Sequence, residues 1–315
     1  MSLEKDINKT GLCASLKKLH SAEYFGEQRD YWWNLDFLQL MEKRWDLKNV
    51  QSVLDVGCGV GHWGRLLSKI LPDTANVIGI DKESGWIEEA KKRAMLDDLG
   101  SRYTYQESDA HAMPFPDESF DMVTCQTVLI HVADVQQVLS EMVRVLKRDG
   151  ILIVIEPNNI GRSLTLSTLD MDTPIDEILD IVRFCLACER GKYELNEGYI
   201  SLGDQLPGYL SDMDLKDIQV YISDKARPFF PPYDSKEQQI VIEERKEWTQ
   251  NNFWIWDEEQ TQKYYEAGGG DPEHFKVYWL KALNRQNKSF LEGIKANKYS
   301  TAGGKLNYCI SARKL

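Results

Sequence analysis

Long apolar runs and clusters of basic residues are both missing from this sequence of 315 residues. No run approaches the ~18 apolar residues that a membrane-spanning helix requires, so we expect no membrane partner. The chain has 38 Lys and Arg residues against 50 Asp and Glu residues, which gives a formal charge of −12. Proteins that bind phosphate backbones need clustered Lys and Arg, and this composition therefore argues against nucleic acid as a partner.

Cysteine is also scarce, with six residues in the chain. Four of the six lie inside apolar stretches, which predicts small buried side chains in a reducing compartment rather than a disulfide scaffold. Cys185 and Cys188 form the only C-x-x-C pair, and neither a second pair nor histidines at ligand spacing accompany them. We therefore expect no metal site. The first residues are too polar for a secretory signal, which favours a cytoplasmic location.

Short β-branched runs alternate with helical patterns through the middle of the chain. The predicted strands are Gln51–Val56, Asn76–Ile80, Arg102–Glu107, Phe120–Cys125 and Gly150–Ile155. The predicted helices between them are His62–Leu71, Ser84–Leu99 and Val135–Leu146. This alternation predicts βαβ units, and therefore an α/β fold with a parallel sheet covered by helices on both faces.

Two aromatic-rich helical segments frame this core. Residues 7–46 show helical patterns with a cluster of aromatic side chains, and residues 235–298 hold ten aromatics in 64 positions. The second segment lies between two further predicted strands, Ile218–Ser223 and Leu306–Ala312. We therefore divide the chain into an N-terminal helical segment (1–48), a core (49–234 and 299–315) and a helical insertion (235–298).

A glycine-rich turn follows the first predicted strand. Gly57, Gly59 and Gly61 stand at alternate positions before the next helix, where glycine lets backbone N–H groups approach a ligand. The helix N-terminus adds a positive dipole end suited to a carboxylate or phosphate. Asp81 ends the next strand, 20 residues after Gly61, and a carboxylate there can accept hydrogen bonds from a ribose diol. The pattern predicts a cofactor that contains adenosine.

The spacing of the glycines indicates which cofactor. A dinucleotide fingerprint, G-x-G-x-x-G, would need glycine where His62 stands, so a nicotinamide-dependent oxidoreductase is disfavoured. Asp55, on the strand before the turn, would repel a pyrophosphate but suits a ligand with an ammonium group. With the motif D-x-G-x-G-x-G over residues 55–61, the chain resembles class I S-adenosylmethionine-dependent methyltransferases, and within them the type 11-like, small-molecule group.

The resemblance extends over roughly residues 50–160 and implies a set of cofactor contacts. It implies a Rossmann-like, seven-stranded, mostly parallel sheet in which Leu306–Ala312 is antiparallel beside Ile218–Ser223. The cofactor would be S-adenosyl-L-methionine and the product S-adenosyl-L-homocysteine. The residues assigned to the cofactor are Asp55, Gly57, Cys58, Gly59, Gly61, Asp81, Lys82, Asp109, Ala110, Gln126, Arg29 and Tyr24.

Several of these assignments have plainer alternatives. In the resemblance, Asp109 and the backbone of Ala110 hold adenine, and Arg29 and Tyr24 reach the carboxylate of the cofactor from the N-terminal segment. Lys82 departs from the family, which has an apolar residue at that position. The three glycines can instead form a structural turn. Likewise, Asp81 can cap the following helix, Asp109 can be a solvated acid, Arg29 a surface residue, and Asp55 can act through the glycine amides.

Methyl transfer itself leaves little trace in a sequence. The reaction is an in-line displacement in which holding the acceptor close and aligned lowers much of the barrier, and a base is needed only if the acceptor must lose a proton. Our candidates for catalysis are His131 and Glu156. Those for the acceptor are Asn158 and Asn159, at the carboxyl end of the fifth strand, and Trp254.

We expect the helical insertion to form a lid over a small, apolar or aromatic acceptor. The alternative is a helical subdomain that packs on itself or on a second subunit, and the chain is expected to be a monomer or a homodimer. Within the same fold, a protein or RNA methyltransferase and a non-catalytic S-adenosylmethionine-binding protein remain open readings. The net charge of −12 counts against RNA.

Overall fold

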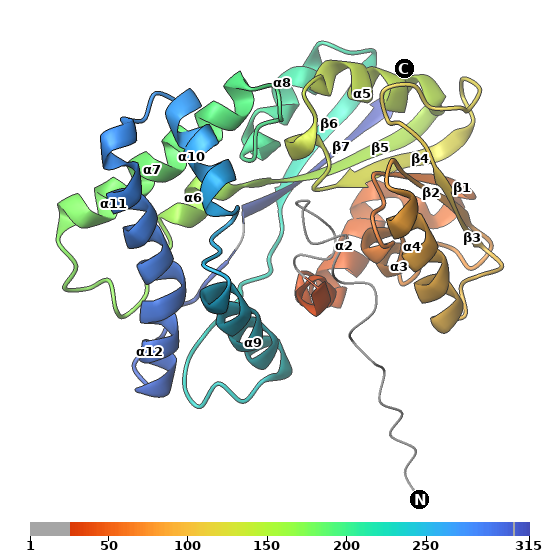
Figure 1. Ribbon diagram of the computed structural model, residues 1–315. Helices are drawn as coiled ribbons and strands as arrows, with labels where there is room; N and C mark the ends of the chain where they lie inside the picture. Colours follow the sequence, from red (N-terminus) through yellow and green to blue (C-terminus); the bar gives the residue numbers. More distant parts are fainter. Residues whose placement is uncertain (1–25, 305) are drawn as a thin grey trace, which may run out of the picture.

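The structure, a computed structural model, describes residues 26–304 and 306–315 (Figure 1). Its centre is a seven-stranded sheet in the order β3-β2-β1-β4-β5-β7-β6. The strands are β1 (Ser52–Val56), β2 (Asn76–Asp81), β3 (Tyr103–Glu107), β4 (Phe120–Gln126), β5 (Leu146–Asn158), β6 (Leu215–Ile222) and β7 (Leu306–Lys314). Strands β1 to β5 pair in parallel, and β7 lies antiparallel between β5 and β6. The predicted α/β, mostly parallel sheet is confirmed.

The two faces of the sheet follow the alternation of side chains along the strands. On β5, Ile151, Ile153 and Ile155 belong to one apolar cluster, while Leu152 and Val154 belong to a second cluster. Helices α2 (Leu35–Trp45), α3 (His62–Leu67) and α4 (Ser84–Leu96) bury their apolar sides in the first cluster. Helices α5 (Val135–Val145) and α8 (Leu206–Ser211) cover the opposite face. The core is therefore a three-layer α/β/α arrangement (Figure 1).

Two of the predicted helices end earlier than expected. After Leu67, the amides of Ser68, Lys69 and Ile70 bond to carbonyls three residues back, which is the tighter 3₁₀ pattern. The helix α4 ends at Leu96, and Asp98 then takes a left-handed backbone with φ 58°. Periodicity alone does not show these local terminations.

The remaining helices form a separate layer outside this three-layer core, beyond the carboxyl end of β5. They are α6 (Asn159–Ser163), α7 (Ile175–Glu194), α9 (Lys236–Gln250), α10 (Glu258–Ala267), α11 (Pro272–Leu283) and α12 (Phe290–Lys295). The short 3₁₀ elements are η1 (Gly26–Tyr31), η2 (Leu47–Asn49), η3 (Leu129–His131) and η4 (Leu202–Asp204), and η5 (Asn284–Ser289) is a π-helix. Helices α6 and α7 follow β5, whereas α9 to α12 lie between β6 and β7 in the chain. We call these two segments together the helical layer.

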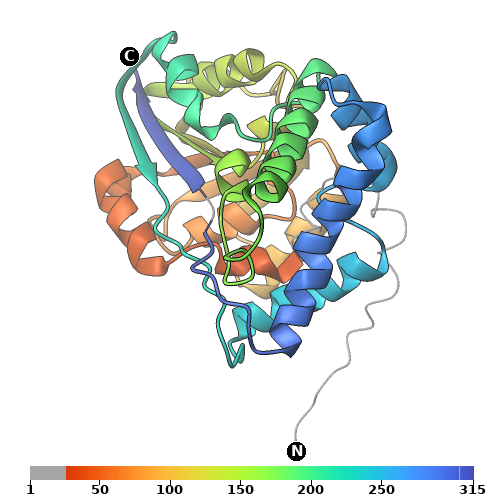
Figure 2. The same ribbon diagram turned by 90° about the vertical axis from the view of Figure 1, so that its left-hand side faces the viewer.

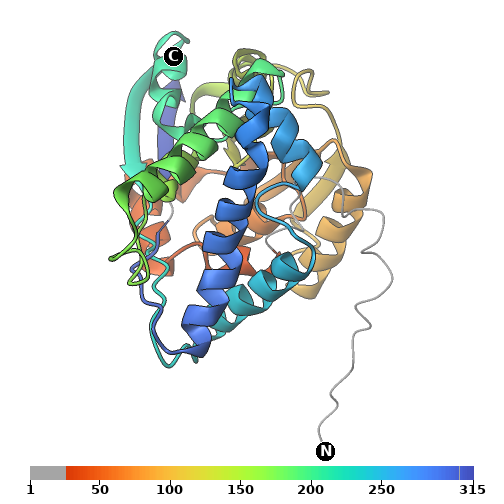
Figure 3. The ribbon, with the colours of Figure 1, turned by 60° about the vertical axis from the view of Figure 1, so that its left-hand side comes forward.

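The helical layer has a core of its own, built mainly from the aromatic residues of 235–298. Helix α7 packs against α10 and α11 (Figures 2 and 3). A Cβ added to Gly191 of α7 would lie 1.7 Å from the backbone oxygen of Tyr264 in α10, so the two helices meet backbone to backbone. Trp256, Tyr264 and Trp279 are at most 1% exposed in this core. The structure thus joins α7, which the sequence division placed in the core, to the helices of the insertion.

Gly268, Gly269 and Gly270 lie between the end of α10 and the start of α11. Gly268 has a second role in packing, because a Cβ there would lie 1.9 Å from the backbone oxygen of Ala187 in α7.

Among the described residues, no helix is long and apolar enough to cross a membrane, and no group of three or more His, Cys, Asp or Glu side chains is placed to hold a metal ion. No disulfide joins the described cysteines, of which Cys58, Cys125, Cys188 and Cys309 are buried and Cys185 is half-buried. Cys13 lies outside the described residues.

Candidate functional site

The glycine turn after β1 is tightly packed. Gly57 has φ 64° and a Cβ there would lie 2.6 Å from both methyl groups of Val128, beyond the end of β4. Gly61 has φ 79° and a Cβ there would lie 2.9 Å from the hydroxyl of Tyr105 on β3. Both positions favour glycine through backbone conformation and space. The turn therefore needs glycine for its own packing, whatever it binds.

Three amides of this turn are already bonded within the protein. The N–H of Cys58 donates to the carbonyl of Ile80 at 2.9 Å, and that of Gly61 donates to the carbonyl of Cys58 at 2.9 Å. The N–H of Gly59 donates to Oδ2 of Asp81 at 2.9 Å. In this state a ligand would meet the turn chiefly through close contact with its backbone, which differs from the expected set of free N–H groups.

Asp55 lies beneath the turn and is 1% exposed. Its Oδ2 accepts the N–H of Gly64 at 3.1 Å, in the first turn of α3. Burial raises the pKa of Asp55 to about 8, and the nearby charge of Asp81 adds to this effect. This geometry suits the alternative in which Asp55 acts by holding backbone amides, and direct contact with a cofactor stays a prediction.

Asp81 ends β2 and connects the glycine turn to the start of α4. Its Oδ2 accepts the N–H of Gly59, and its Oδ1 accepts the N–H of Glu83 at 3.1 Å. Asp81 is 7% exposed, and burial raises its pKa. The carboxylate is therefore fixed in position beside the turn, as expected for a residue that receives a ribose. The bond to Glu83, the residue before α4, also ties Asp81 to the chain that leads into this helix.

The end of β3 brings the third predicted motif beside Asp81. The N–H of Ser108 donates to the carbonyl of Asp81 at 2.9 Å. Asp109 is exposed, and its Oδ1 accepts the backbone N–H of His111 at 2.9 Å, with the His111 ring nitrogen Nδ1 2.8 Å away. Both contacts lower the pKa of Asp109. Lys82 is exposed, and Ala110 packs at the edge of the apolar cluster on the α5 side.

The ends of β4 and β5 are connected by Glu156, which is fully buried. Its Oε1 accepts the N–H groups of Val128 and Leu129, each at 2.8 Å, and burial raises its pKa to about 8. This gives Glu156 a structural task in the turn that follows Gln126. His131 is exposed, in η3. The catalytic roles of Glu156 and His131 stay predictions.

The N-terminal segment lies against the helix of the glycine turn. The rings of Trp33 and Trp63 are 5.4 Å apart, and Trp63 lies in α3. Burial and the charge of Arg93 lower the pKa of Arg29 to about 10. Arg93 in turn lies 3.3 Å from the ring of His62, the first residue of α3. Arg29 is therefore on the cofactor side of the molecule, while Tyr24 lies outside the described residues.

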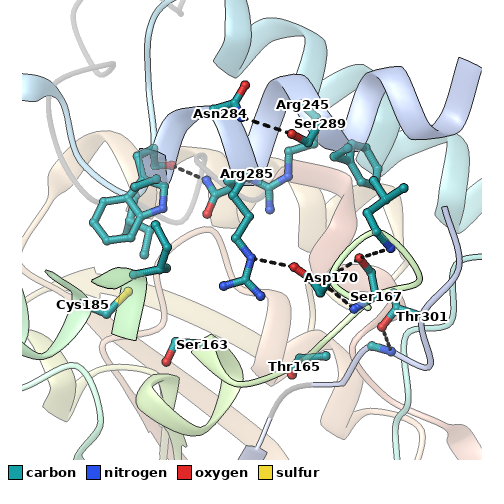
Figure 4. A pocket seen from close by; sticks show the side chains of 18 of the residues that line it. Ser163, Thr165, Ser167, Asp170, Cys185, Arg245, Asn284, Arg285, Ser289 and Thr301 are labelled. Carbon is teal, nitrogen blue, oxygen red and sulfur yellow. Dashed lines mark hydrogen bonds and ion pairs between the residues drawn. The ribbon is translucent and has the colours of Figure 1, made fainter. Parts of the chain in front are cut away.

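A cavity of about 360 Å³ opens in the helical layer (Figure 4). Asn159 and Trp254 line it, as do Gln28 of η1 and Glu189 of α7. Asn158 instead is the last residue of β5, directly before α6: its Oδ1 accepts the N–H of Gly161 at 2.8 Å, and its Nδ2 donates to Asp204 at 3.1 Å. The structure thus brings two of the three predicted acceptor residues together at one cavity.

Polar side chains make up much of the cavity wall. The guanidinium of Arg285 lies 3.2 Å from Asp170, whose carboxylate also accepts the hydroxyl of Ser167 at 2.8 Å (Figure 4). On the apolar side stand Ile181 and Trp254. Sequence reasoning missed the polar lining, since its parts lie far apart along the chain, from Gln28 to Thr301. The sequence does carry one indication of it. Glu189 stands four residues after Cys185 and eight after Ile181, on the apolar face of the helix, where a charged residue is unexpected.

Residues 54–154 match the family model described as a methyltransferase domain. The chain is 30% identical over 149 residues to the uncharacterized methyltransferase YcgJ of Bacillus subtilis, covering 47% of this chain and 54% of that protein. A crystal structure of YcgJ from that species aligns with a TM-score of 0.48 and 21% identity, over 89% of this chain and 99% of the other.

Two further relatives carry more specific names. Sterol 24-C-methyltransferase of Aspergillus fumigatus is 30% identical over 174 residues, which is 52% of this chain and 45% of that protein. Demethylmenaquinone methyltransferase of Lactobacillus johnsonii is 35% identical over 114 residues, which is 36% of this chain and 47% of that protein. The chain spans about half the length of these curated relatives. With the glycine turn and the two acids at the matching strand ends, residues 54–154 match the methyltransferase domain family, and the predicted resemblance is confirmed over that range.

Proposed function

We propose that this protein transfers a methyl group from S-adenosylmethionine to a small-molecule acceptor. The observation that carries the proposal is the placement of Asp81 and Asp109 beside the glycine turn, at the carboxyl ends of three adjacent strands. Ligands of open α/β sheets bind at this edge. The match of residues 54–154 to the methyltransferase domain family supports the same reading.

The residues present fit such a cofactor. The turn at Gly57 and Gly61 leaves no room for side chains, which allows close approach of a ligand to the backbone. Asp81 keeps lone pairs for the ribose hydroxyls, and exposed Asp109, with the backbone of Ala110, would hold adenine. Cys58, Gly59, Lys82, Gln126 and Arg29 would form the rest of the wall. When bound, the cofactor supplies a methyl group that is already activated by positive sulfur.

The contribution of the chain is to bind, align and exclude water. The cavity begins at Asn159, directly after β5, and the helical layer covers it. We propose that this layer, with residues 235–298 as its larger part, acts as the lid over the acceptor. The names of the sterol and demethylmenaquinone methyltransferases agree with a small-molecule acceptor. The described cysteines form no disulfide, which suits a reducing compartment such as the cytoplasm.

Ligand binding separates this proposal from other cofactors. Calorimetry should show binding of S-adenosylmethionine and S-adenosylhomocysteine but not of NAD or NADP, and a ligand at 100 times its Kd should stabilise the fold by about 2.7 kcal/mol. Asp81→Ala should weaken both adenosyl ligands about tenfold or more, because a charged hydrogen-bond acceptor is lost.

The matched control is Asp73→Ala, an exposed acid before β2, which should leave both affinities unchanged. Binding of NAD alone, or equal effects of the two substitutions, would contradict the proposed function.

A further inference from the structure

Glu189 is a buried carboxyl group at the wall of the cavity. The residue is 3% exposed, and its Oε2 has no hydrogen-bond partner among the described residues. Buried polar atoms are nearly always paired, since an unpaired one costs free energy that folding must offset. A helix position on the face of Ile181 and Cys185 would pack well with an apolar residue. The acid at this place therefore points to a task other than stability.

Four cationic side chains line the cavity, and each has a contact elsewhere. Arg285 pairs with Asp170 at 3.2 Å, Lys281 with Asp180 at 2.7 Å and Arg227 with Glu237 at 3.5 Å. The guanidinium of Arg245 lies over the ring of Trp248, 4.1 Å from its centroid. On α7 itself, Nζ of Lys192 donates to the carbonyls of Ile130 and Glu197. Oε2 of Glu189 can therefore accept a hydrogen bond from a molecule inside the cavity.

Glu189 lies at the end of the cavity that faces the sheet. The hydroxyl of Ser201 bonds to the Glu189 carboxyl and also accepts the N–H of Ile160, at the start of α6. Asn159 donates to the carbonyl of Ile200, and both residues line the cavity. This end is therefore connected to the carboxyl end of β5, the edge where the proposed cofactor site lies.

We propose that the cavity binds the methyl acceptor. We further propose that Glu189 selects a molecule with a hydroxyl or amino group, which donates a hydrogen bond to Oε2 of Glu189. This inference rests on the proposed function and names the class of its acceptor. The molecule also has an aromatic or aliphatic body, because Ile181, Trp254 and Trp256 form the apolar wall beside Glu189. The polar lining changes the expected acceptor from an apolar molecule to an amphipathic one.

Pairs of small probes test this assignment. The affinities of 2-naphthol and its methyl ether, and of 2-naphthylmethylamine and its dimethylated form, are measured by ligand-observed NMR with S-adenosylhomocysteine present. In the wild type at least one donor probe should bind about tenfold or more tightly than its methylated counterpart. Glu189→Gln should abolish that preference, because a neutral amide accepts a hydrogen bond less strongly than a carboxylate.

The matched control is Glu177→Gln, an exposed glutamate on the same helix that also lines the cavity. It should keep the preference of the wild type. Equal binding of both members of each pair to the wild type, no binding of any probe at millimolar concentration, or a preference that survives in Glu189→Gln would each overturn the inference.

Thermal melting checks that both variants fold, and Glu189→Gln is expected to fold because it keeps the shape of the side chain without a buried charge. Calorimetry with S-adenosylhomocysteine on the same samples separates the two proposals. Binding of that ligand with no probe preference would remove only the acceptor assignment, whereas its failure to bind would remove the proposed function itself.

Discussion

The proposed site in the sheet core and the cavity in the helical layer differ in how far apart their residues lie in the sequence. In the core, the proposed cofactor site consists of one turn and of acids at strand ends, so Gly57, Gly61 and Asp81 lie within 25 residues of one another. In the helical layer, the cavity is lined by Gln28, Asn159 and Tyr299 among others, which lie far apart in the chain. The first kind of site follows from strand order, whereas the second exists only once distant helices have packed.

Gly57→Ala places a methyl group in the packed glycine turn of the sheet core, and it should have the largest effect on the unfolding free energy. The new methyl group would lie 2.6 Å from Val128 on a backbone with φ 64°. We expect a loss of about 2–5 kcal/mol of unfolding free energy, from backbone strain and overpacking together, with loss of S-adenosylhomocysteine binding. Chemical denaturation and calorimetry measure both quantities. The control is Gly208→Ala, at an exposed position of α8 with open space around it, which should be neutral or stabilise by up to about 1 kcal/mol. A similar result for both variants would refute the packing account.

Gly191→Ala is the corresponding test in the helical layer. Its methyl group would lie 1.7 Å from the backbone oxygen of Tyr264, so α7 and α10 must separate. We expect a loss of about 1–3 kcal/mol, with probe binding in the cavity weakened and affinity for S-adenosylhomocysteine kept within about twofold. Equal loss of both kinds of binding would show that the two regions are not separable sites.

Asp55, buried in the sheet core, should make the stability of the protein depend on pH. Its pKa is raised from the ordinary 3.8 to about 8, so the folded state binds more protons than the unfolded state between these values. Stability should therefore fall as pH rises through this range, by up to about 1.4 kcal/mol per pH unit for this group. Asp55→Asn should show a shallower decline in urea denaturation between pH 5 and 8. Parallel curves for wild type and variant would argue that Asp55 is ionised in the folded protein.

Asp109→Asn should have the smallest effect on stability. The side chain is exposed, and within the described part of the chain its bonds go to His111, so the unfolding free energy should change by less than about 0.5 kcal/mol. Affinity for S-adenosylmethionine should nevertheless fall about fivefold, since an exposed acid at the end of β3 is placed to meet the adenine amino group. Asp73→Asn is the control for calorimetry. An unchanged affinity would assign Asp109 to solvent, as the plain alternative had it.

The strands were predictable from the sequence because buried parallel strands are nearly continuous runs of Ile, Leu and Val. Where prediction fell short, pairing with another strand decided the outcome. Strand β5 extends to Asn158, past Pro157, because its end pairs with Asn307 and Leu306 of β7. Local sequence at Glu156-Pro157-Asn158 is typical of a loop, and only the antiparallel neighbour makes it a strand.

The site was predictable to the extent that it is local. The glycine turn, Asp81 and the adjacent third strand lie where the spacing placed them. The packing roles of Gly191 and Gly268, and the presence of Glu189 and Trp254 at one cavity, depend on contacts between α7 and residues some 65 to 80 positions later. No pattern within a single segment reports such contacts.

A crystal structure with S-adenosylhomocysteine tests the central claim most directly. The account predicts that the nucleoside lies against the turn at Gly57 to Gly61, with its ribose hydroxyls on Asp81 and its sulfur directed toward the carboxyl end of β5. A structure in which this turn stays empty at saturating ligand, or in which the nucleoside occupies another surface, would contradict it.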